Sequence, residues 1–180
     1  MSYLNNSASS LIVDNLPLFN ALNKDKYVLD LACGSGRNGL FLLNNDIPIV
    51  FADKNKIALN TILSVAPPNS EVRYKCWEVD FERSLKAPLK VEAYSSILIF
   101  NYLHRPLFPA IKAAIARGGL IFYETFTEHQ RNFGRPKNPA YLLKQNELLQ
   151  EFENWEIIHW FEGIKLSPER AVSSVIARKP

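Results

Sequence analysis

The sequence predicts an α/β fold with a mostly parallel, seven-stranded sheet that carries helices on both faces and ends in an antiparallel hairpin. Short apolar runs alternate with helical stretches over most of the chain, and this repetition of strand and helix is typical of a parallel sheet. Near the end, two β-rich runs at 155–161 and 171–178 are separated by only a loop's length. Strands joined in that way must be antiparallel neighbours.

Each element follows from a local pattern, taken in chain order. A first apolar run leads into a glycine turn and a helical stretch, and a second run leads into a helix that Pro67 and Pro68 end. The third run alternates between apolar and polar residues, which is typical of a strand. The fourth run is continuously apolar, as expected of a strand buried on both faces. The expected strands are 27–31, 47–52, 72–79, 95–100, 120–123, 155–161 and 171–178, and the expected helices are 38–43, 55–65, 106–116, ended by Gly118 and Gly119, and 140–152.

Length and composition indicate one domain of ordinary globular type. The 180 residues suit a single domain at 11–180 after a polar tail at 1–10. A net charge of +3 does not by itself indicate a nucleic-acid partner. Cys33 and Cys76 form no disulfide framework and no metal motif. No apolar run reaches the length of a membrane span and the start does not resemble a signal peptide, so we expect a cytoplasmic protein.

The sharpest signal is a glycine loop between the first strand and the first helix. Gly34-x-Gly36-x-x-Gly39 satisfies the dinucleotide-binding fingerprint, and Asp53 stands where a ribose-binding acid is expected. In a dinucleotide fold, however, the first glycine follows the apolar strand directly. Here Asp30 lies at the strand end, where its carboxylate suits the cationic ammonium of a ligand better than a pyrophosphate.

This loop closely resembles the S-adenosylmethionine-binding loop of the class I methyltransferases, whose parallel sheet also ends in an antiparallel hairpin. The run from Cys33 to Asn38 and the later Asp53-Lys54-Asn55 are similar to the bacterial tellurite-resistance type, as are 154–156 and 174–179. Between 101 and 143 the chain departs from that type, so no substrate is inherited from it. The patterns at 102–108 and 123–126 resemble a group of uncharacterised bacterial methyltransferases.

The resemblance implies the cofactor S-adenosylmethionine, the product S-adenosylhomocysteine and a set of binding residues. Asp53 is expected to accept hydrogen bonds from both ribose hydroxyls, although it could instead cap the following helix. Asp80 is expected at the adenine amino group and Phe81 at the ring, while Arg37 could meet the methionine carboxylate or a surface acid. The complete expected set is Asp30, Ala32, Gly34, Gly36, Arg37, Asp53, Lys54, Asp80, Phe81 and Asn101.

The end of the fourth strand provides the candidates for catalysis, because strand ends on this side of an open α/β sheet point at the ligand crevice. Methyltransferases of exocyclic amino groups or glutamine amides often have Asn-Pro-Pro and an aromatic residue here, whereas this chain has Asn101-Tyr102-Leu103-His104. His104 is a candidate general base, with Tyr102 and Glu124 as orienting groups. It could equally be a capping or core histidine.

Three arginines are candidates for binding an anionic acceptor. Arg105 could do so, or could pair with Glu124. The long polar stretch at 127–138 is expected to form a lid over the methyl group. Within it, Arg131 and Arg135 suit a carboxylate or phosphate.

The sequence therefore predicts a methyltransferase that uses S-adenosylmethionine and acts on a small molecule. An RNA or protein acceptor stays open, since the isoelectric point is about 8.8. An NAD(P)-dependent oxidoreductase is permitted by the glycine pattern alone. Asp30, the terminal hairpin and the lack of a Tyr-x-x-x-Lys pair stand against it. Oligomeric state is not fixed by the sequence.

Overall fold

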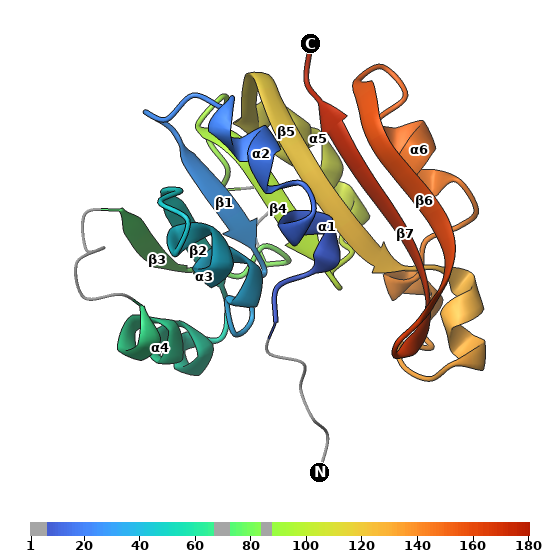
Figure 1. Cartoon of the computed structure of the whole chain (residues 1–180). Coiled ribbons are helices and arrows are strands. Elements are labelled where there is room, and N and C mark those ends of the chain that lie inside the picture. The colour runs from blue at the N-terminus through green and yellow to red at the C-terminus, as the bar shows by residue number, and fades with distance from the viewer. Residues whose placement is uncertain (1–6, 67–72, 84–87) are drawn as a thin grey trace.

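The computed structural model describes residues 7–66, 73–83 and 88–180, and its centre is a seven-stranded sheet in the order β3-β2-β1-β4-β5-β7-β6 (Figure 1). The neighbours from β3 to β5 pair in parallel, and β7 pairs antiparallel with both β5 and β6. This confirms the predicted fold class. The strands are β1 Tyr27–Leu31, β2 Ile49–Asp53, β3 Tyr74–Glu78, β4 Tyr94–Phe100, β5 Ile115–Phe126, β6 Glu156–Leu166 and β7 Glu169–Arg178.

Helices cover both faces of the sheet (Figure 1). One face carries α1 Ser10–Val13, α2 Leu16–Asn20, α3 Arg37–Leu43 and α4 Lys56–Val65. The opposite face carries α5 Phe108–Ala114 and α6 Glu147–Glu151. Three short 3-10 turns, η1 Arg105–Leu107, η2 Glu128–Asn132 and η3 Pro139–Tyr141, lie in the connections after β4 and β5.

The alternation of side chains along β5 divides the core into two layers. Ile121 and Tyr123 pack in the layer under α5 and α6, whereas Leu120 and Phe122 pack under α1 to α4. Phe19 of α2 stacks on Phe122 with ring centroids 4.7 Å apart. Burying an aromatic side chain of this kind contributes roughly 1.5–3 kcal/mol, so the first described helices form part of the core.

Two predicted helices are shorter than the sequence pattern indicated. The one expected at 106–116 ends at Ala114, and Ile115 begins β5. Gly118 does not end the helix. It lies inside β5 with a φ of 72°, where the pairing of β5 with β4 shifts register. The helix expected at 140–152 is interrupted because Leu143 donates its backbone N–H to Phe126 and bridges Thr127, which holds this part of the chain against the end of β5.

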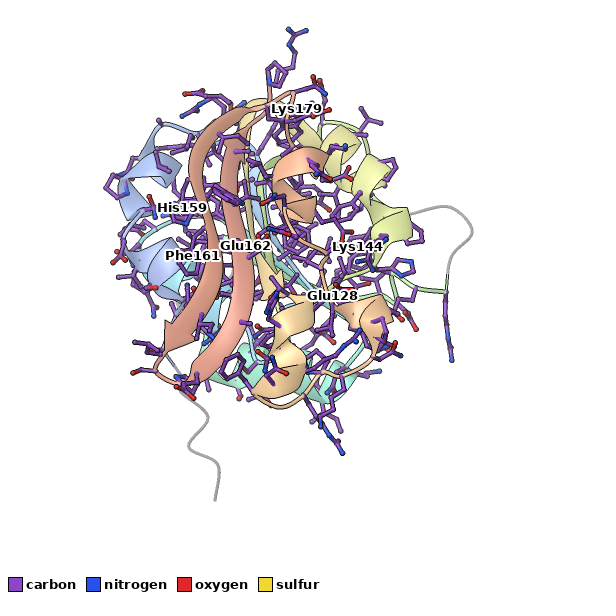
Figure 2. All side chains as sticks on the ribbon, turned by 90° about the vertical axis from the view of Figure 1, so that its right-hand side faces the viewer. Glu128, Lys144, His159, Phe161, Glu162 and Lys179 are labelled. Atoms are coloured by element: carbon purple, nitrogen blue, oxygen red, sulfur yellow. The ribbon has the colours of Figure 1, made fainter. Side chains whose placement is uncertain are left out.

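The terminal hairpin is longer than predicted. The residues expected in a loop at 162–170 mostly continue the two strands, and only Ser167 and Pro168 connect them. Figure 2 shows the hairpin from its outer edge, with His159 and Phe161 on one side of β6 and Glu162 on the other. The backbone N–H of Asn146, just before α6, donates to the Glu162 carboxylate at 3.1 Å, so the hairpin also holds the segment that leads into α6.

The described end of the predicted polar tail at 1–10 packs against the domain. Ser9 is buried, caps α1 by accepting from the Leu11 N–H, and donates its own N–H to Asn38 of α3 at 2.9 Å. The rest of that tail up to residue 6 lies outside the described residues, as do Pro67, Pro68 and the expected strand start at 72.

Candidate active site

The glycine loop turns sharply between β1 and α3. Ala32, Gly34 and Gly36 all have positive φ values, of 53°, 53° and 70°. Gly36 also has a packing reason to lack a side chain, because a Cβ there would lie 2.6 Å from Cδ1 of Ile62. At Gly34 a Cβ would meet no atom within 4 Å, so the space beside this glycine is open to a ligand.

Asp30 is buried at the end of β1 and holds the helix that follows the loop. Its Oδ2 accepts the backbone N–H of Gly39 at 3.0 Å, so the carboxyl group also organises the turn. Burial raises the pKa of the Asp30 carboxyl to about 7. A carboxyl of this kind gains its charge readily when a cationic group approaches, so the ammonium-binding prediction is chemically reasonable.

Asp53 links the loop to the neighbouring strand. Its Oδ2 accepts the N–H of Gly34 at 2.8 Å, and its Oδ1 accepts the N–H of Asn55 at 2.8 Å. Asp53 is not the helix cap that the sequence allowed as an alternative: Asn55 caps α4 by accepting from Ile57 and Ala58. Each oxygen of Asp53 keeps further lone pairs, so the carboxylate is fixed in place and still able to accept hydroxyls.

Three cavities surround these residues at the carboxyl ends of β1, β2 and β4. The Asp53 cavity, of about 210 Å³, is lined by Ala32, Asp53, Lys54, Val79, Asp80, Phe81, Glu82 and Tyr102. The glycine-loop cavity, of about 280 Å³, is lined by Asp30, Ala32, Cys33, Gly34, Ser35, Arg37, Asn38, Phe100 and Asn101. The Tyr141 cavity, of about 510 Å³, is lined by Lys54, Glu82, Asn101, Tyr102, Leu103, Phe126, Arg135, Pro136 and Tyr141.

The three cavities share walls and therefore form one site. Ala32 lines the Asp53 cavity and the glycine-loop cavity, while Asn101 lines the glycine-loop cavity and the Tyr141 cavity. Lys54, Glu82 and Tyr102 lie between the Asp53 cavity and the Tyr141 cavity. All ten residues predicted to bind the cofactor lie at this site, and nine of them line a cavity; the exception is Gly36, which packs behind the loop.

The acidic turn after β3 is held by its own hydrogen bonds. Asp80 accepts the N–H of Glu82 at 3.0 Å and lies 3.5 Å from the Arg83 guanidinium. Phe81 is buried and packs edge to face on Trp77, with centroids 5.7 Å apart. Both predicted adenine-binding residues therefore have structural partners as well as a position on the Asp53 cavity.

The end of β4 is strained where it meets all three cavities. Asn101 has a φ of 56°, and its N–H donates to the Glu124 carbonyl of β5 at 2.9 Å. Such backbone strain in a residue other than glycine is found most often at functional sites. The next residue, Tyr102, is anchored through its carbonyl, which accepts the Tyr123 hydroxyl at 3.0 Å.

The Tyr102 hydroxyl is buried and makes no hydrogen bond of good geometry with the described residues. Burial raises the pKa of this phenol, and the carboxylates of Glu82 and Asp80 raise it further. Tyr102 is therefore a neutral hydroxyl beside the cavities, available to donate. Burial also raises the pKa of the Cys33 thiol, which disfavours the thiolate that a nucleophilic cysteine needs.

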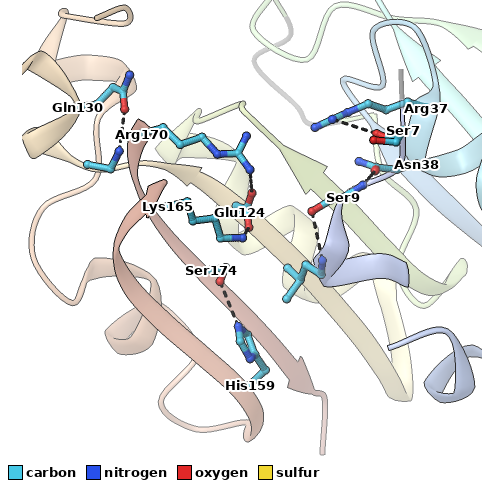
Figure 3. A network of polar contacts seen from close by, with 12 residues as sticks. Ser7, Ser9, Arg37, Asn38, Glu124, Gln130, His159, Lys165, Arg170 and Ser174 are labelled. Carbon is cyan, nitrogen blue, oxygen red and sulfur yellow. Dashed lines mark hydrogen bonds and ion pairs between the residues drawn. The ribbon is translucent and has the colours of Figure 1, made fainter. Parts of the chain in front are cut away.

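The other two predicted catalytic residues, unlike Tyr102, line none of the three cavities. His104 is half-buried, precedes η1 and lines none of the three cavities. Glu124 is 1% exposed and pairs with Lys165 at 2.6 Å and Arg170 at 3.4 Å, both from the terminal hairpin (Figure 3). Their catalytic roles stay predictions.

The candidate arginines differ in how many hydrogen bonds and ion pairs they make within the protein. Arg105 forms a two-pronged ion pair with Glu147, at 2.6 and 2.8 Å, and donates to the carbonyls of Ala140 and Leu142. The alternative pairing with Glu124 is wrong. Arg37 donates to the Ser7 carbonyl at 3.2 Å (Figure 3). Arg131 and Arg135 are exposed, and only Arg135 lines a cavity.

Sequence reasoning missed several residues that shape the site. Tyr141 and Lys165 fell inside an expected helix and an expected loop, and Glu82 lies two residues beyond Asp80 in a turn without a motif. Phe126 was noted only as part of a pattern. Among the described residues, no group of three or more His, Cys, Asp or Glu could hold a metal ion, and no helix is long and apolar enough to cross a membrane.

Comparison with known sequences places residues 18–167 in the family described as Tellurite resistance protein TehB. Comparison with the curated proteins gives no significant match.

Comparison with solved structures gives many relatives of the same fold. TehB from Haemophilus influenzae superposes with a TM-score of 0.73 at 19% identity, covering 99% of this chain and 64% of that chain. This chain thus spans less than two thirds of the length of that protein. A SAM-dependent methyltransferase from Methanosarcina mazei has a TM-score of 0.68 at 14% identity, with 96% and 98% covered. A SAM-dependent methyltransferase from Aquifex aeolicus has a TM-score of 0.65 at 16% identity, covering 93% of this chain and 89% of that chain.

Proposed function

Since the chain belongs to the TehB family and has the fold of the class I SAM-dependent methyltransferases, we propose that it binds S-adenosylmethionine across the three cavities and methylates a small organic molecule. The observation that carries the proposal is the Asp53 carboxylate, fixed on the Gly34 N–H where the Asp53 cavity meets the glycine loop. This arrangement suits a ligand with a ribose and a charged amino-acid end.

The residues present fit such a cofactor. In this proposal Asp53 accepts the ribose hydroxyls with its remaining lone pairs, while Asp80 and Phe81 hold the adenine. Asp30 faces the ammonium group and Arg37 the carboxylate of the amino-acid part. The open space beside Gly34 supports a close approach of the ligand to the loop.

The cofactor, when bound, supplies an electrophilic methyl group, and S-adenosylhomocysteine is its product. The protein's contribution is then chiefly to hold the acceptor in line and to exclude water, which can contribute roughly 7–11 kcal/mol. Asn101 lines both the glycine-loop cavity and the Tyr141 cavity, and in this proposal the acceptor and the methyl group meet beside it. Where the acceptor must lose a proton, His104 is the proposed base, acting through water because it lines none of the three cavities. Tyr102 and Glu124 are the proposed orienting groups.

A calorimetric titration of S-adenosylhomocysteine into four proteins, the wild type and three variants, tests the proposal. Asp53→Ala should weaken binding by about 1–3 kcal/mol, since it removes hydrogen bonds to the ribose and to the loop. Asp53→Asn, which keeps one accepting oxygen, should fall between that variant and the wild type. The control is Asp25→Ala, an exposed acid away from the cavities. Equal affinity in all variants would remove Asp53 from the site.

A further inference from the structure

The walls of the Tyr141 cavity are aromatic and apolar. Tyr102, Phe126 and Tyr141 come from three separate segments, and Leu103 and Pro136 complete the lining. Tyr141 is 48% exposed although it is a large aromatic residue. Aromatic faces that are left uncovered at a cavity are suited to pack against a flat apolar ligand.

The charged groups of the same cavity favour an anion. Lys54 and Arg135 line it together with one carboxylate, Glu82, which leaves an excess of one positive charge. No hydrogen bond or ion pair engages the Arg135 guanidinium among the described residues, in contrast to Arg105, which is fully engaged. A free guanidinium binds a carboxylate through two parallel hydrogen bonds.

The volume of the cavity indicates an organic ligand. Its size of about 510 Å³ lies within the roughly 300–1,000 Å³ that is usual for sites of drug-sized molecules. An inorganic oxyanion such as tellurite would reach Arg135 but would leave the aromatic walls in contact with water. The family name therefore does not decide the acceptor of this chain.

We propose that the acceptor in the Tyr141 cavity is a planar aromatic carboxylate, with its ring between Tyr102, Phe126 and Tyr141 and its carboxylate on Arg135. This rests on the proposed function, because it names the acceptor of the same site. Lys54 adds to the positive field, and Glu82, next to the cofactor end of the cavity, leaves the Arg135 end for the carboxylate.

The test is a binding titration on protein saturated with S-adenosylhomocysteine. Four probes are compared: 4-hydroxybenzoate, its neutral analogue 4-hydroxybenzyl alcohol, its non-planar analogue 4-hydroxycyclohexanecarboxylate, and tellurite. We expect 4-hydroxybenzoate to bind about tenfold or more tightly than each of the others, because only it satisfies both the arginine and the rings.

Three variants test which residues bind the probes. Arg135→Gln should weaken 4-hydroxybenzoate binding about tenfold and leave the benzyl alcohol unchanged. Lys137→Gln, an exposed cation two residues further on that does not line the cavity, should change neither. Tyr141→Ala should weaken both aromatic probes.

The other outcomes overturn the proposal. Equal affinity for the charged and neutral aromatic probes, equal effects of Arg135→Gln and Lys137→Gln, preference for tellurite, or no binding of any probe each contradict it. Failure of S-adenosylhomocysteine to bind in the first step is a different result, since it removes the proposed function itself.

Discussion

The Asp53 carboxylate accepts the backbone N–H of Gly34 at 2.8 Å, so the end of β2 holds the loop that follows β1. The two residues lie 19 positions apart in the chain, and the parallel pairing of β1 with β2 brings them together. The same carboxylate fixes Asn55 at the start of α4. One side chain therefore determines the shape of two cavity walls before any ligand binds, which is the preorganisation that a binding site needs.

Asp30 is expected to make stability depend on pH. Burial raises the pKa of its carboxyl from 3.8 to about 7 in the folded protein. The folded state then keeps a proton that the unfolded chain has released, so this group lowers the free energy of unfolding as the pH rises from about 4 to about 7. The side chain introduced by Asp30→Asn stays neutral at every pH. The free energy of unfolding of this variant should therefore exceed that of the wild type by about 1–4 kcal/mol above pH ~8, with no difference of this origin below pH ~4.

Urea unfolding of both proteins across this pH range measures the effect, and Asp25→Asn, an exposed acid, is the control. The quantity of interest is the difference between variant and wild type, because other carboxyls titrate in both. A difference that stays constant with pH would contradict the raised pKa of Asp30.

Arg105 is expected to hold the segment that carries Tyr141. Burial would raise the pKa of Glu147, but the Arg105 guanidinium and the Lys144 N–H lower it, as in a strong ion pair. Arg105→Gln should lower the free energy of unfolding by about 1–3 kcal/mol and speed amide hydrogen exchange at 139–147. Arg131→Gln, an exposed arginine outside the cavities, should do neither. Unchanged exchange in the Arg105 variant would show that other contacts hold this segment.

Tyr102→Phe is expected to weaken binding of the acceptor with little change in the stability of the fold. The hydroxyl is buried, has no hydrogen bond of good geometry with the described residues and has the Glu82 carboxylate near it as a polar partner. Its removal should therefore change the free energy of unfolding by no more than about 1 kcal/mol in either direction. Affinity for 4-hydroxybenzoate should fall if the hydroxyl orients the acceptor. In Tyr123→Phe, the matched control, loss of the bond to the Tyr102 carbonyl should lower stability. A Tyr102 variant with lower stability and full affinity would contradict this assignment.

His104 lines none of the three cavities, so as a base it would act through a bridging water. On that hypothesis His104→Ala is expected to slow methyl transfer and to leave cofactor affinity unchanged. Loss of a general base typically costs 10²–10⁴-fold in rate. The measurement is the formation of S-adenosylhomocysteine against pH with an acceptor that binds in the Tyr141 cavity. His129→Ala, an exposed histidine on η2, is the control. Turnover that matches the wild type at every pH would show that His104 is not the base.

The fold could be predicted because its signals are local. The apolar runs, the glycine loop and the two final strands without an intervening helix each follow from nearby residues. Together they predict a mostly parallel sheet that ends in an antiparallel hairpin. The residues proposed to bind the cofactor are brought together for the same reason: Asp30, Gly34 and Asp53 stand at or just after the ends of strands that pair in parallel. Residues that are far apart along the chain therefore lie close together at one edge of the sheet.

The rest of the site depends on contacts between distant segments. The pattern at 140–152 is helical in sequence, but Leu143 pairs with the end of β5 and Asn146 has a φ of 59°, which breaks the helix and leaves Tyr141 on the cavity. The partners of Glu124 come from a hairpin whose register no local pattern fixes. Tertiary contacts of this kind override local propensity.

The most direct test of the central claim is a calorimetric titration of the wild-type protein with S-adenosylhomocysteine, NAD and NADP in parallel. We expect micromolar binding of S-adenosylhomocysteine and no binding of either nicotinamide nucleotide. Binding of a nicotinamide nucleotide, or no binding of S-adenosylhomocysteine, would contradict the methyltransferase assignment at its base.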